Sequence, residues 1–311
     1  MKLLVSGSSG HLARVLLPRL CAHPQVEELH GLDRRPAVFR HPCYRHHVLD
    51  IRDPAVGQVA ADCDAVIHLA FVVQRGALGR RRRDRALMAA VNREGTANLF
   101  QAAARAGVRR AVHLSSAAVY GAWPDNPPRI REDRPLRPNP GFAYAEDKAA
   151  VEHWLETFAA RYPELSVAVL RPHASLGRNA LPLLRALLRL PFYPHLGQPL
   201  PLTQCVWEED VAEAVLAALQ RDVSGAFNLA AEPALPFRDL QRHLHRFPLP
   251  VPPSLARFAV RGLWLFTGAA GEPAWLEGMR HSLALDCGRA RRELSWQPSA
   301  TVYDCLRRTL A

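Results

Sequence analysis

The sequence predicts an α/β fold, a doubly wound parallel sheet followed by a smaller, mostly helical C-terminal lobe. Through the first two thirds of the chain, short apolar runs rich in β-branched residues alternate with longer amphipathic stretches, which is typical of strands that alternate with covering helices. The 311 residues exceed the roughly 100 to 200 of an average domain, and 49% of them are hydrophobic, enough for a sizeable core. Beyond residue 172 the alternation breaks into proline-rich connections and short helices.

Each strand is predicted by an apolar run, and the last run returns late in the chain: "KLLVS" (2–6), "VEELHGL" (26–32), "YRHHVLD" (44–50), "AVIHLA" (65–70), "AVHLSS" (111–116), "VAVLR" (167–171) and "AFNLA" (226–230). Amphipathic stretches predict helices at about 10–22, 53–61, 84–106 and 142–161. We therefore expect a first domain over residues 1–172, with returning segments near 204–230. A second lobe over 173–311 is expected to be interleaved with the first.

The charge pattern does not indicate a nucleic-acid partner. The formal net charge is +11, but the arginines are spread along the whole chain. No finger, helix-turn-helix pattern or basic patch interleaved with aromatic residues accompanies them. The same positive field would attract a small anionic substrate or the phosphates of a cofactor, so we expect a small-molecule partner and no nucleic acid.

The cysteines and the apolar segments predict a cytoplasmic protein without a metal site or a membrane anchor. The six cysteines are scattered, with no CxxC pair and no spacing typical of metal ligands, and indicate reduced thiols. The apolar run at the N-terminus has four residues, too few for a signal peptide. Arg257 and Arg261 interrupt the most apolar later segment, 255–271, which favours a lid or packing helix over a membrane-surface helix.

A glycine-rich turn joins the first strand to the first helix. The stretch reads Gly7-Ser-Ser-Gly10-His-Leu-Ala13. Glycine lets the backbone turn tightly and approach a pyrophosphate, which the N–H groups and the dipole of the following helix stabilise. The placement predicts a Rossmann-type dinucleotide-binding domain, and the later lobe then becomes the substrate-binding lobe. The predicted pyrophosphate contacts are Gly7, Ser9, Gly10, His11 and Leu12.

Asp33 lies at the end of the second predicted strand. A carboxylate there accepts hydrogen bonds from both hydroxyls of an adenosine ribose and repels a 2′-phosphate. Arg34 and Arg35 follow it, and their guanidinium groups could instead hold that phosphate. The pattern favours NAD as the cofactor, with NADP as the alternative, over a surface turn of solvated charges.

Tyr144 and Lys148 are four residues apart on a predicted helix and therefore share one face. Only two of the 40 basic residues, Lys2 and Lys148, are lysines, so that 38 are arginines. A lysine supplies a compact ammonium with a tunable pKa, which an arginine does not. An ammonium beside a phenol lowers the pKa of the phenol from about 10 toward neutrality, which predicts an acid/base pair for a carbinol or carbonyl oxygen.

With these residues in place, the chain resembles the extended short-chain dehydrogenase/reductase superfamily, particularly the NAD-dependent epimerase/dehydratase family. The resemblance covers nearly all of the chain and depends on the joint order of weak motifs. These motifs are Gly7-x-x-Gly10-x-x-Ala13, Asp33, "LDIRD" (49–53), "HLA" (68–70), "VNREGTANLFQAA" (91–103), "SSAAVYG" (115–121), Tyr144-x-x-x-Lys148, "LRP" (170–172), "VWEEDVAEAV" (206–215), "GAFNLA" (225–230) and "RARRELSWQP" (289–298).

The resemblance assigns roles by position. It implies Ser116, Tyr144 and Lys148 as catalytic residues, with Ser116 also touching substrate and Lys148 also holding the nicotinamide ribose. It implies further cofactor contacts at Asp50 and Ile51 beside the adenine, at Leu69 and Ala70 beneath the cofactor, at Asn92 behind the site and at Pro172 beside the nicotinamide. Members of the family often dimerise through the helices that are here 84–106 and 142–161, so we expect a homodimer.

Three further positions are candidates for substrate contact: Phe71, His173 and Arg178. His173 follows "LRP", where relatives line the pocket, but a packed histidine fits the sequence equally well. The Arg80 to Arg83 run could border the substrate mouth, although a solvated charge run is favoured. For Asn92 the family role is favoured, and a polar residue on a helix surface is the alternative.

Departures from the family pattern reduce the number of reactions that fit this sequence. Sugar-nucleotide dehydratases carry Asp-Glu where this chain has Ala117 and Ala118, and nucleotide-sugar epimerases grip the diphosphate with an Asn and an Arg where it has Ala174 and Thr203. The sequence therefore predicts an NAD(P)-dependent oxidoreductase that acts on a secondary alcohol or ketone. An epimerase with tightly bound NAD and a non-catalytic NAD(P)-sensing binding protein are the alternatives.

Overall fold

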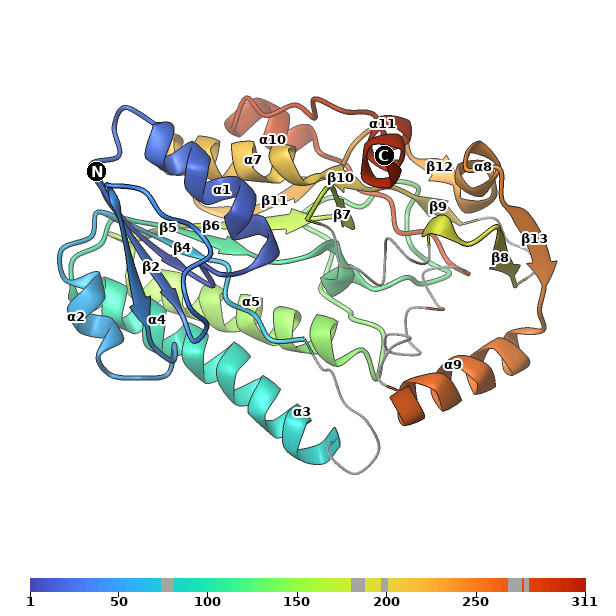
Figure 1. The fold of residues 1–311 in the computed structure, drawn as a ribbon, viewed down its shortest axis with the longest axis horizontal. Helices are drawn as coiled ribbons and strands as arrows, with labels where there is room; N and C mark the ends of the chain where they lie inside the picture. Colours follow the sequence, from blue (N-terminus) through green and yellow to red (C-terminus); the bar gives the residue numbers. More distant parts are fainter. Residues whose placement is uncertain (74–80, 180–187, 197–200, 268–275, 277–279) are drawn as a thin grey trace.

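A computed structural model describes residues 1–73, 81–179, 188–196, 201–267, 276 and 280–311. Within these residues, a seven-stranded parallel sheet in the order β11-β6-β5-β4-β1-β2-β3 forms the centre of the molecule (Figure 1). Its strands are β1 (Lys2–Ser6), β2 (Glu28–Asp33), β3 (Tyr44–Val48), β4 (Ala65–His68), β5 (Arg110–Leu114), β6 (Ser166–Pro172) and β11 (Gly225–Leu229). The seven predicted strands are confirmed, with ends within about two residues of those expected.

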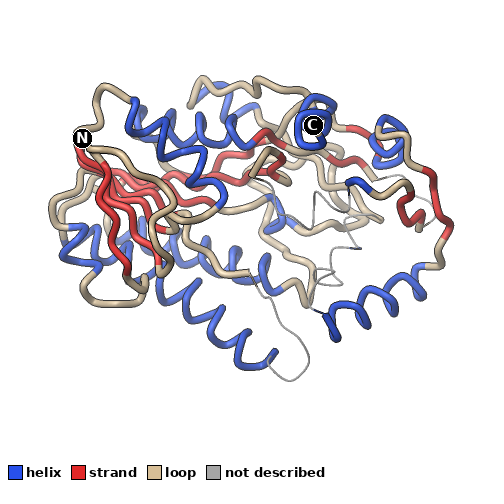
Figure 2. Tube along the Cα trace, in the orientation of Figure 1, coloured by secondary structure: helices blue, strands red, loops and turns tan. Residues whose placement is uncertain are grey.

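Helices cover both faces of the sheet, as Figures 1 and 2 show. One face carries α1 (His11–Ala22) and α7 (Glu208–Arg221), and the other carries α2 (Val56–Ala60), α3 (Arg81–Ala89), α4 (Gly95–Arg105) and α5 (Ala143–Arg161). The helix expected over 84–106 is interrupted, because a π-helical segment, Ala90–Glu94, separates α3 from α4. A short 3₁₀ turn, Ala117–Tyr120, follows β5. In open sheets of this kind, ligands bind outside the carboxyl ends of the strands.

The described later part of the chain contains four further helices, and its division into a separate lobe stays a prediction. Its helices are α8 (Phe237–His243), α9 (Pro253–Thr267), α10 (Gly288–Glu293) and α11 (Val302–Leu310). Among the described residues it also contains three two-stranded sheets, which the sequence pattern did not predict. They pair β7 (Ser175–Leu176) with β10 (Val206–Trp207), β9 (Leu202–Thr203) with β12 (Leu235–Pro236), and β8 (Phe192–His195) with β13 (Phe247–Pro250). None of the helices in the described part of the chain is long and apolar enough to cross a membrane.

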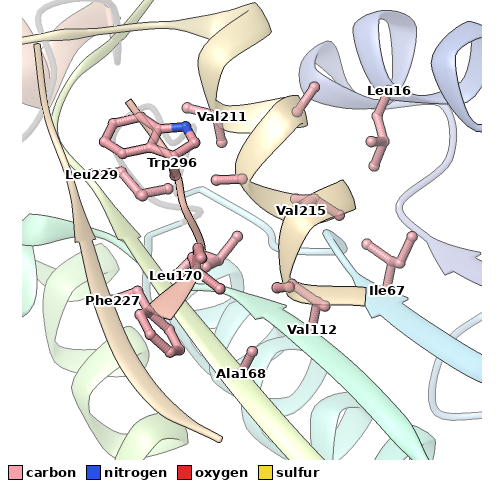
Figure 3. Close-up of a cluster of buried hydrophobic side chains, with 14 of the residues drawn as sticks. Leu16, Ile67, Val112, Ala168, Leu170, Val211, Val215, Phe227, Leu229 and Trp296 are labelled. Carbon is pink, nitrogen blue, oxygen red and sulfur yellow. The ribbon is translucent and has the colours of Figure 1, made fainter. Parts of the chain in front are cut away.

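The hydrophobic core has a cluster on each face of the sheet, one toward α4 and α5 and one toward the layer of α1 and α7. Figure 3 shows Leu16 from α1 and Val215 from α7 above the sheet residues Ile67 and Val112. Trp296, near the C-terminal end of the chain, closes this cluster, and its Nε1–H donates to the backbone oxygen of Asp210 at 2.7 Å. The C-terminal segment is thereby fixed to the helix that follows β10.

His113 is a buried polar residue on the face of the sheet that α4 covers. Its ring is fully buried, with the ring centroid of His68 at 5.1 Å and that of Phe100 at 6.4 Å. In the part of the chain that the structure describes, neither of its ring nitrogens has a hydrogen-bond partner. Burial, followed by the charges of Lys148 and His68, lowers the pKa of His113 well below its usual range. The folded protein therefore keeps this imidazole neutral at neutral pH.

We predict that His113→Leu flattens the loss of stability in acid. Above pH 6.5 the histidine is neutral in both states, whereas at lower pH the unfolded chain binds a proton that the folded chain does not. The wild-type free energy of unfolding should therefore fall by about 2 kcal/mol more than that of the variant between pH 7 and pH 5. Urea unfolding at both pH values measures this difference. His153→Gln, which changes an exposed histidine, is the control and should lose as much free energy of unfolding between pH 7 and pH 5 as the wild type. An equally large loss in His113→Leu would contradict the prediction.

Candidate active site

The glycine loop lies against the chain that leaves β4. Gly7 has a φ of +73°, and a Cβ placed on it would lie 2.6 Å from the backbone nitrogen of Ala70. The N–H of Leu69 donates to the oxygen of Ser6 at 3.1 Å, which fixes the position of this crossing. No side chain caps α1 at Gly10. Only a residue without a side chain fits at position 7, so the predicted Leu69–Ala70 floor and the glycine loop are in contact.

Asp33 lies beside the glycine loop, at the end of β2, as the sequence predicted. One of its carboxylate oxygens accepts the N–H of Ser9 at 3.1 Å, and the other accepts the N–H of Arg35 at 2.9 Å. Burial acts to raise the pKa of Asp33, but hydrogen bonds from Arg35 and Ser9 outweigh it and lower the pKa below the usual value. Arg34 points elsewhere, with its Nε 3.7 Å from the carboxylate of Asp50. The carboxylate of Asp33 is therefore ionised and already paired with Arg35.

Asp50 and Ile51 follow β3 and have different surroundings. Arg52 donates from its backbone and its side chain to Asp50, and these hydrogen bonds lower the pKa of Asp50 to about 2. Ile51 is buried against Gly95. A Cβ placed on Gly95 would lie only 2.3 Å from Cγ2 of Ile51. Asp50 thus has a polar, charged environment formed by Arg52, and Ile51 has an apolar one.

The three predicted catalytic side chains meet at the carboxyl ends of β4 and β5. Tyr144 lies in the first turn of α5, and the Ser116 hydroxyl is close enough to act on its pKa. Oγ of Ser116 accepts the N–H of Ala118 at 3.2 Å. Nζ of Lys148 donates to the backbone oxygen of Leu114. The ring of Phe71 contacts both Tyr144 and Lys148. Its centroid is 5.3 Å from that of the Tyr144 ring and 3.7 Å from Nζ of Lys148.

The prediction that Lys148 lowers the pKa of Tyr144 is wrong for this structure. Burial raises the pKa of Tyr144, and the nearby hydroxyl of Ser116 only partly opposes it. Burial also lowers the pKa of Lys148 to about 7, although the charge of Glu152 acts in the opposite direction. The physical reason is that the ammonium contacts Leu114 and Phe71, so its charge is not directed at the phenol.

Asn92 lies in the π-helical segment, and the alternative that placed it on a helix surface is wrong. Its side chain is fully buried. Its Oδ1 accepts the N–H of Val72 at 2.8 Å, and its Nδ2 donates to the oxygen of Val72 at 3.0 Å and to Asp147 at 3.3 Å. Asn92 therefore fixes the chain just after Phe71 and connects it to α5.

A buried ion pair next to the site escaped the sequence analysis. Glu152 lies four residues after Lys148 on α5 and pairs with Arg171 of β6 through two oxygen–nitrogen contacts of 2.6 and 2.9 Å. Arg171 also donates to the phenolic oxygen of Tyr120 at 2.6 Å, and Ser115 donates to Glu152. The spacing of four residues that singled out Tyr144 and Lys148 could have identified Glu152 as well.

The remaining candidates lie at or beyond the end of β6. Pro172 ends that strand. Nε2 of His173 is 2.9 Å from the oxygen of Leu283 and its Nδ1 accepts the N–H of Ala174 at 2.8 Å, and burial lowers its pKa to about 4. These contacts favour the packed histidine over a substrate ligand. Arg178 lines a cavity of about 510 Å³ together with Trp207, Arg308 and Ala311, and neither Ser116 nor Tyr144 lines it. Arg80 and the side chains of Arg81 to Arg83 lie outside the described residues.

We predict that Lys148→Met changes the pH dependence of stability. The pKa of Lys148 is lowered from 10.5 to about 7, so the folded protein bears the cost of a buried ammonium at and below pH 7. This cost disappears as the pH rises toward 10.5, because the folded protein then loses the proton that the unfolded chain keeps. The advantage of the variant in free energy of unfolding should therefore shrink by about 2 kcal/mol between pH 7 and pH 9.

Guanidinium unfolding at pH 7, 8 and 9 measures this effect. Lys2→Met is the matched control, since Lys2 is the chain's other lysine and its side chain is 42% exposed. The control should differ from the wild type by the same amount at each pH. A constant difference for Lys148→Met as well would mean that Lys148 is not buried as a charge.

Comparisons with known proteins agree with this geometry. A family model described as "NAD dependent epimerase/dehydratase family" matches residues 3–230. The chain is 31% identical to a 3-diazoavenalumate denitrifying reductase of Streptomyces sp, over 96% of each chain, and 28% identical to a UDP-glucose 4-epimerase of Mycolicibacterium smegmatis, over 100% of this chain and 97% of the relative. Its fold resembles that of DesIV, a dTDP-glucose 4,6-dehydratase of Streptomyces venezuelae solved with NAD and TYD bound, with a TM-score of 0.75, 24% identity, and 100% of this chain and 96% of that chain covered. The chain belongs to the NAD-dependent epimerase/dehydratase family.

Proposed function

We propose that this chain is an NAD-linked oxidoreductase that interconverts a secondary alcohol and a ketone. The observation that carries the proposal is the grouping of three side chains at the end of β5. The hydroxyl of Ser116 lies close enough to act on the pKa of Tyr144, and the ring of Phe71 contacts both Tyr144 and Lys148. A phenol and a hydroxyl that lie this close together can both reach one substrate oxygen. The family match over residues 3–230 supports an enzyme, and the reductase relative supports this reaction type.

The residues present fit a dinucleotide. The contact of Gly7 with the backbone of Ala70 leaves no room for a side chain in the loop, and α1 begins without a side-chain cap. The ionised Asp33 at the end of β2 favours ribose hydroxyls over a 2′-phosphate, which supports NAD over NADP. NAD supplies the acceptor or donor of the hydride when it is bound. The residues that would hold it are Gly7, Ser9, Gly10, His11, Leu12, Asp33, Arg34, Asp50, Ile51, Leu69, Ala70, Asn92, Tyr144, Lys148 and Pro172.

The chain's own residues would handle the proton. In the reductive direction the carbonyl carbon gains a hydride, the C=O π bond breaks, and the oxygen takes the proton of the Tyr144 phenol. Ser116 donates a hydrogen bond that orients this oxygen. The raised pKa of Tyr144 suits this direction, because the phenol holds its proton until the substrate oxygen needs it. Solvent then returns a proton to Tyr144.

The substrate proposed is a small ketone or secondary alcohol rather than a sugar nucleotide. Ala117 and Ala118 follow Ser116 and supply no acid or base for a dehydration. Ala174 and Thr203 occupy the positions where the family's epimerases grip a nucleotide diphosphate. The net charge of +11 favours an anionic substrate. The homodimer and the cytoplasmic location remain predictions from the sequence.

An epimerase is the second candidate, because the relative from Mycolicibacterium smegmatis is a UDP-glucose 4-epimerase that the chain matches over its whole length. For this reaction Tyr144 would take the proton of a carbinol and later return it, Ser116 would orient the oxygen, and NAD would supply the acceptor and donor of the hydride. Native mass spectrometry of the purified protein separates the two candidates. Retained NAD with no net consumption of NADH supports the epimerase, whereas stoichiometric NADH consumption supports the reductase.

We predict that Gly7→Ala abolishes NAD binding and that Gly107→Ala does not. Both glycines have a φ of +73°, so both variants bear the same backbone strain, about 1 to 2 kcal/mol. A Cβ at Gly7 would lie 2.6 Å from the backbone of Ala70, whereas a Cβ at Gly107 would have no neighbour within 4 Å. Calorimetric titration with NAD measures binding. Equal NAD affinity in the two variants would contradict the predicted position of the cofactor.

We predict that Tyr144→Phe reduces turnover by about 100- to 10,000-fold while NAD binding is kept, because the ring remains and the transferable proton is lost. The assay follows NADH oxidation with a panel of small ketones, and NAD reduction with secondary alcohols and UDP-glucose. Tyr162→Phe, at the C-cap of α5, is the control and should keep full activity. Unchanged biological activity of Tyr144→Phe would instead favour the non-catalytic sensor.

A further inference from the structure

Two cysteines and a histidine from separate segments meet outside the candidate active site. Cys21 lies in the last turn of α1, whereas His41 and Cys43 lie in the connection between β2 and β3. The Sγ atoms of Cys21 and Cys43 are 2.7 Å apart, and Nδ1 of His41 is 3.1 Å from Sγ of Cys43. All three ligand atoms lie within 4.8 Å of one another.

This cluster lies at the edge of the sheet opposite the glycine loop. The loop follows the carboxyl end of β1, and α1 runs back from it, so Cys21 lies near the amino-terminal ends of the strands. Cys43 directly precedes β3, and its backbone oxygen accepts the N–H of Leu29 at 2.8 Å. An ion bound here would join α1 to the start of β2 and β3 and would not contact Tyr144.

We propose that Cys21, His41 and Cys43 bind one thiophilic divalent cation of the zinc type, with water as the fourth ligand. Thiolate and imidazole are the ligands that zinc prefers. Tetrahedral zinc, with Zn–S of about 2.3 Å and Zn–N of about 2.0 Å, separates its sulfurs by about 3.8 Å and a sulfur from a nitrogen by about 3.6 Å. The two sulfurs therefore separate by about 1 Å on binding. His41 is exposed, so the fourth position faces solvent.

The histidine distinguishes this cluster from a pair of cysteines that forms a disulfide. Cys205 and Cys305 form a second pair of neighbouring thiols: both are buried, and Cys305 is the largest cause that raises the pKa of Cys205. Within the described residues, no histidine or carboxylate completes a group of three at that second pair. The chain thus contains its own comparison, a thiol pair with an imidazole and a thiol pair without one.

Binding would stabilise the fold rather than take part in the reaction. The ligands close the segment from 21 to 43, which contains β2 and Asp33. Because the unfolded chain does not hold the three ligands together, the free energy of binding adds to that of folding. The cation would thereby join the end of α1 to the residues before β3. Those residues are hydrogen-bonded to β2, the strand that carries Asp33, through Leu29 and Cys43.

The test uses the full chain, kept reduced and treated with a chelator. Titration with Co²⁺ should give one ion per chain, with the charge-transfer bands of cobalt thiolate and the d–d bands of a tetrahedral site, and Zn²⁺ should displace it and raise Tm. Cys21→Ser, Cys43→Ser and His41→Gln should each weaken binding by more than about 100-fold, since changes outside the ligand shell already cost 10- to 100-fold. Cys305→Ser and His153→Gln should bind as the wild type does.

Three results would overturn the proposal: no tight binding by the reduced wild type, equal binding by the ligand variants, or a Cys21–Cys43 disulfide as the only product when the chain is exposed to air and Zn²⁺ together. NAD binding is measured on the same samples. It should be unchanged in every variant, because none of these residues contacts the glycine loop. If the metal proposal fails, the proposed reaction is unaffected. If the wild type does not bind NAD, the proposed reaction fails and the metal proposal is unaffected.

Discussion

The buried ion pair of Glu152 and Arg171 is the constraint on which the candidate site depends. Both side chains are almost fully buried, with 2% and 4% of their surface exposed, and Arg171 also contacts Tyr120. The pair joins α5 to β6 and to the turn after β5. Removing one partner of such a pair typically costs about 3 to 5 kcal/mol, because the other charge is left buried alone. Tyr144 and Lys148 lie on the same helix face as Glu152, so the pair fixes their height above the sheet.

Asp147 anchors the other side of α5. Its carboxylate is fully buried and accepts hydrogen bonds from Arg85, Arg93 and Asn92, which lie on α3 and the π-helical segment. The extra residue of a π-helical turn rotates the side chains that follow, and such turns are frequent at functional sites. Here the turn directs Asn92 toward both Val72 and Asp147. The helix that carries Tyr144 and the chain that carries Phe71 are therefore held by one set of contacts.

Lys148 shows why a lysine stands here among 38 arginines. Its ammonium is surrounded by the ring of Phe71 and one backbone oxygen, a space that suits a compact cation on a flexible stem. The same surroundings lower its pKa to about 7 and leave the phenol of Tyr144 with a raised pKa. The proposed acid/base chemistry would therefore begin from a protonated tyrosine, and the spacing of Tyr144 and Lys148 did not indicate this.

The sequence by itself determined where the seven strands of the sheet lie along the chain, the glycine loop, the place of Asp33 at the end of β2 and the shared helix face of Tyr144 and Lys148. These features follow from local periodicity and from the rule that parallel strands present their carboxyl ends at one edge. Only the tertiary structure decided the break at Ala90–Glu94, the position of Phe71 and the direction of the pKa of Tyr144. It alone brought Cys21, 22 residues from Cys43, next to His41. Burial and contacts between distant segments depend on how helices pack across the sheet, which local sequence patterns do not encode.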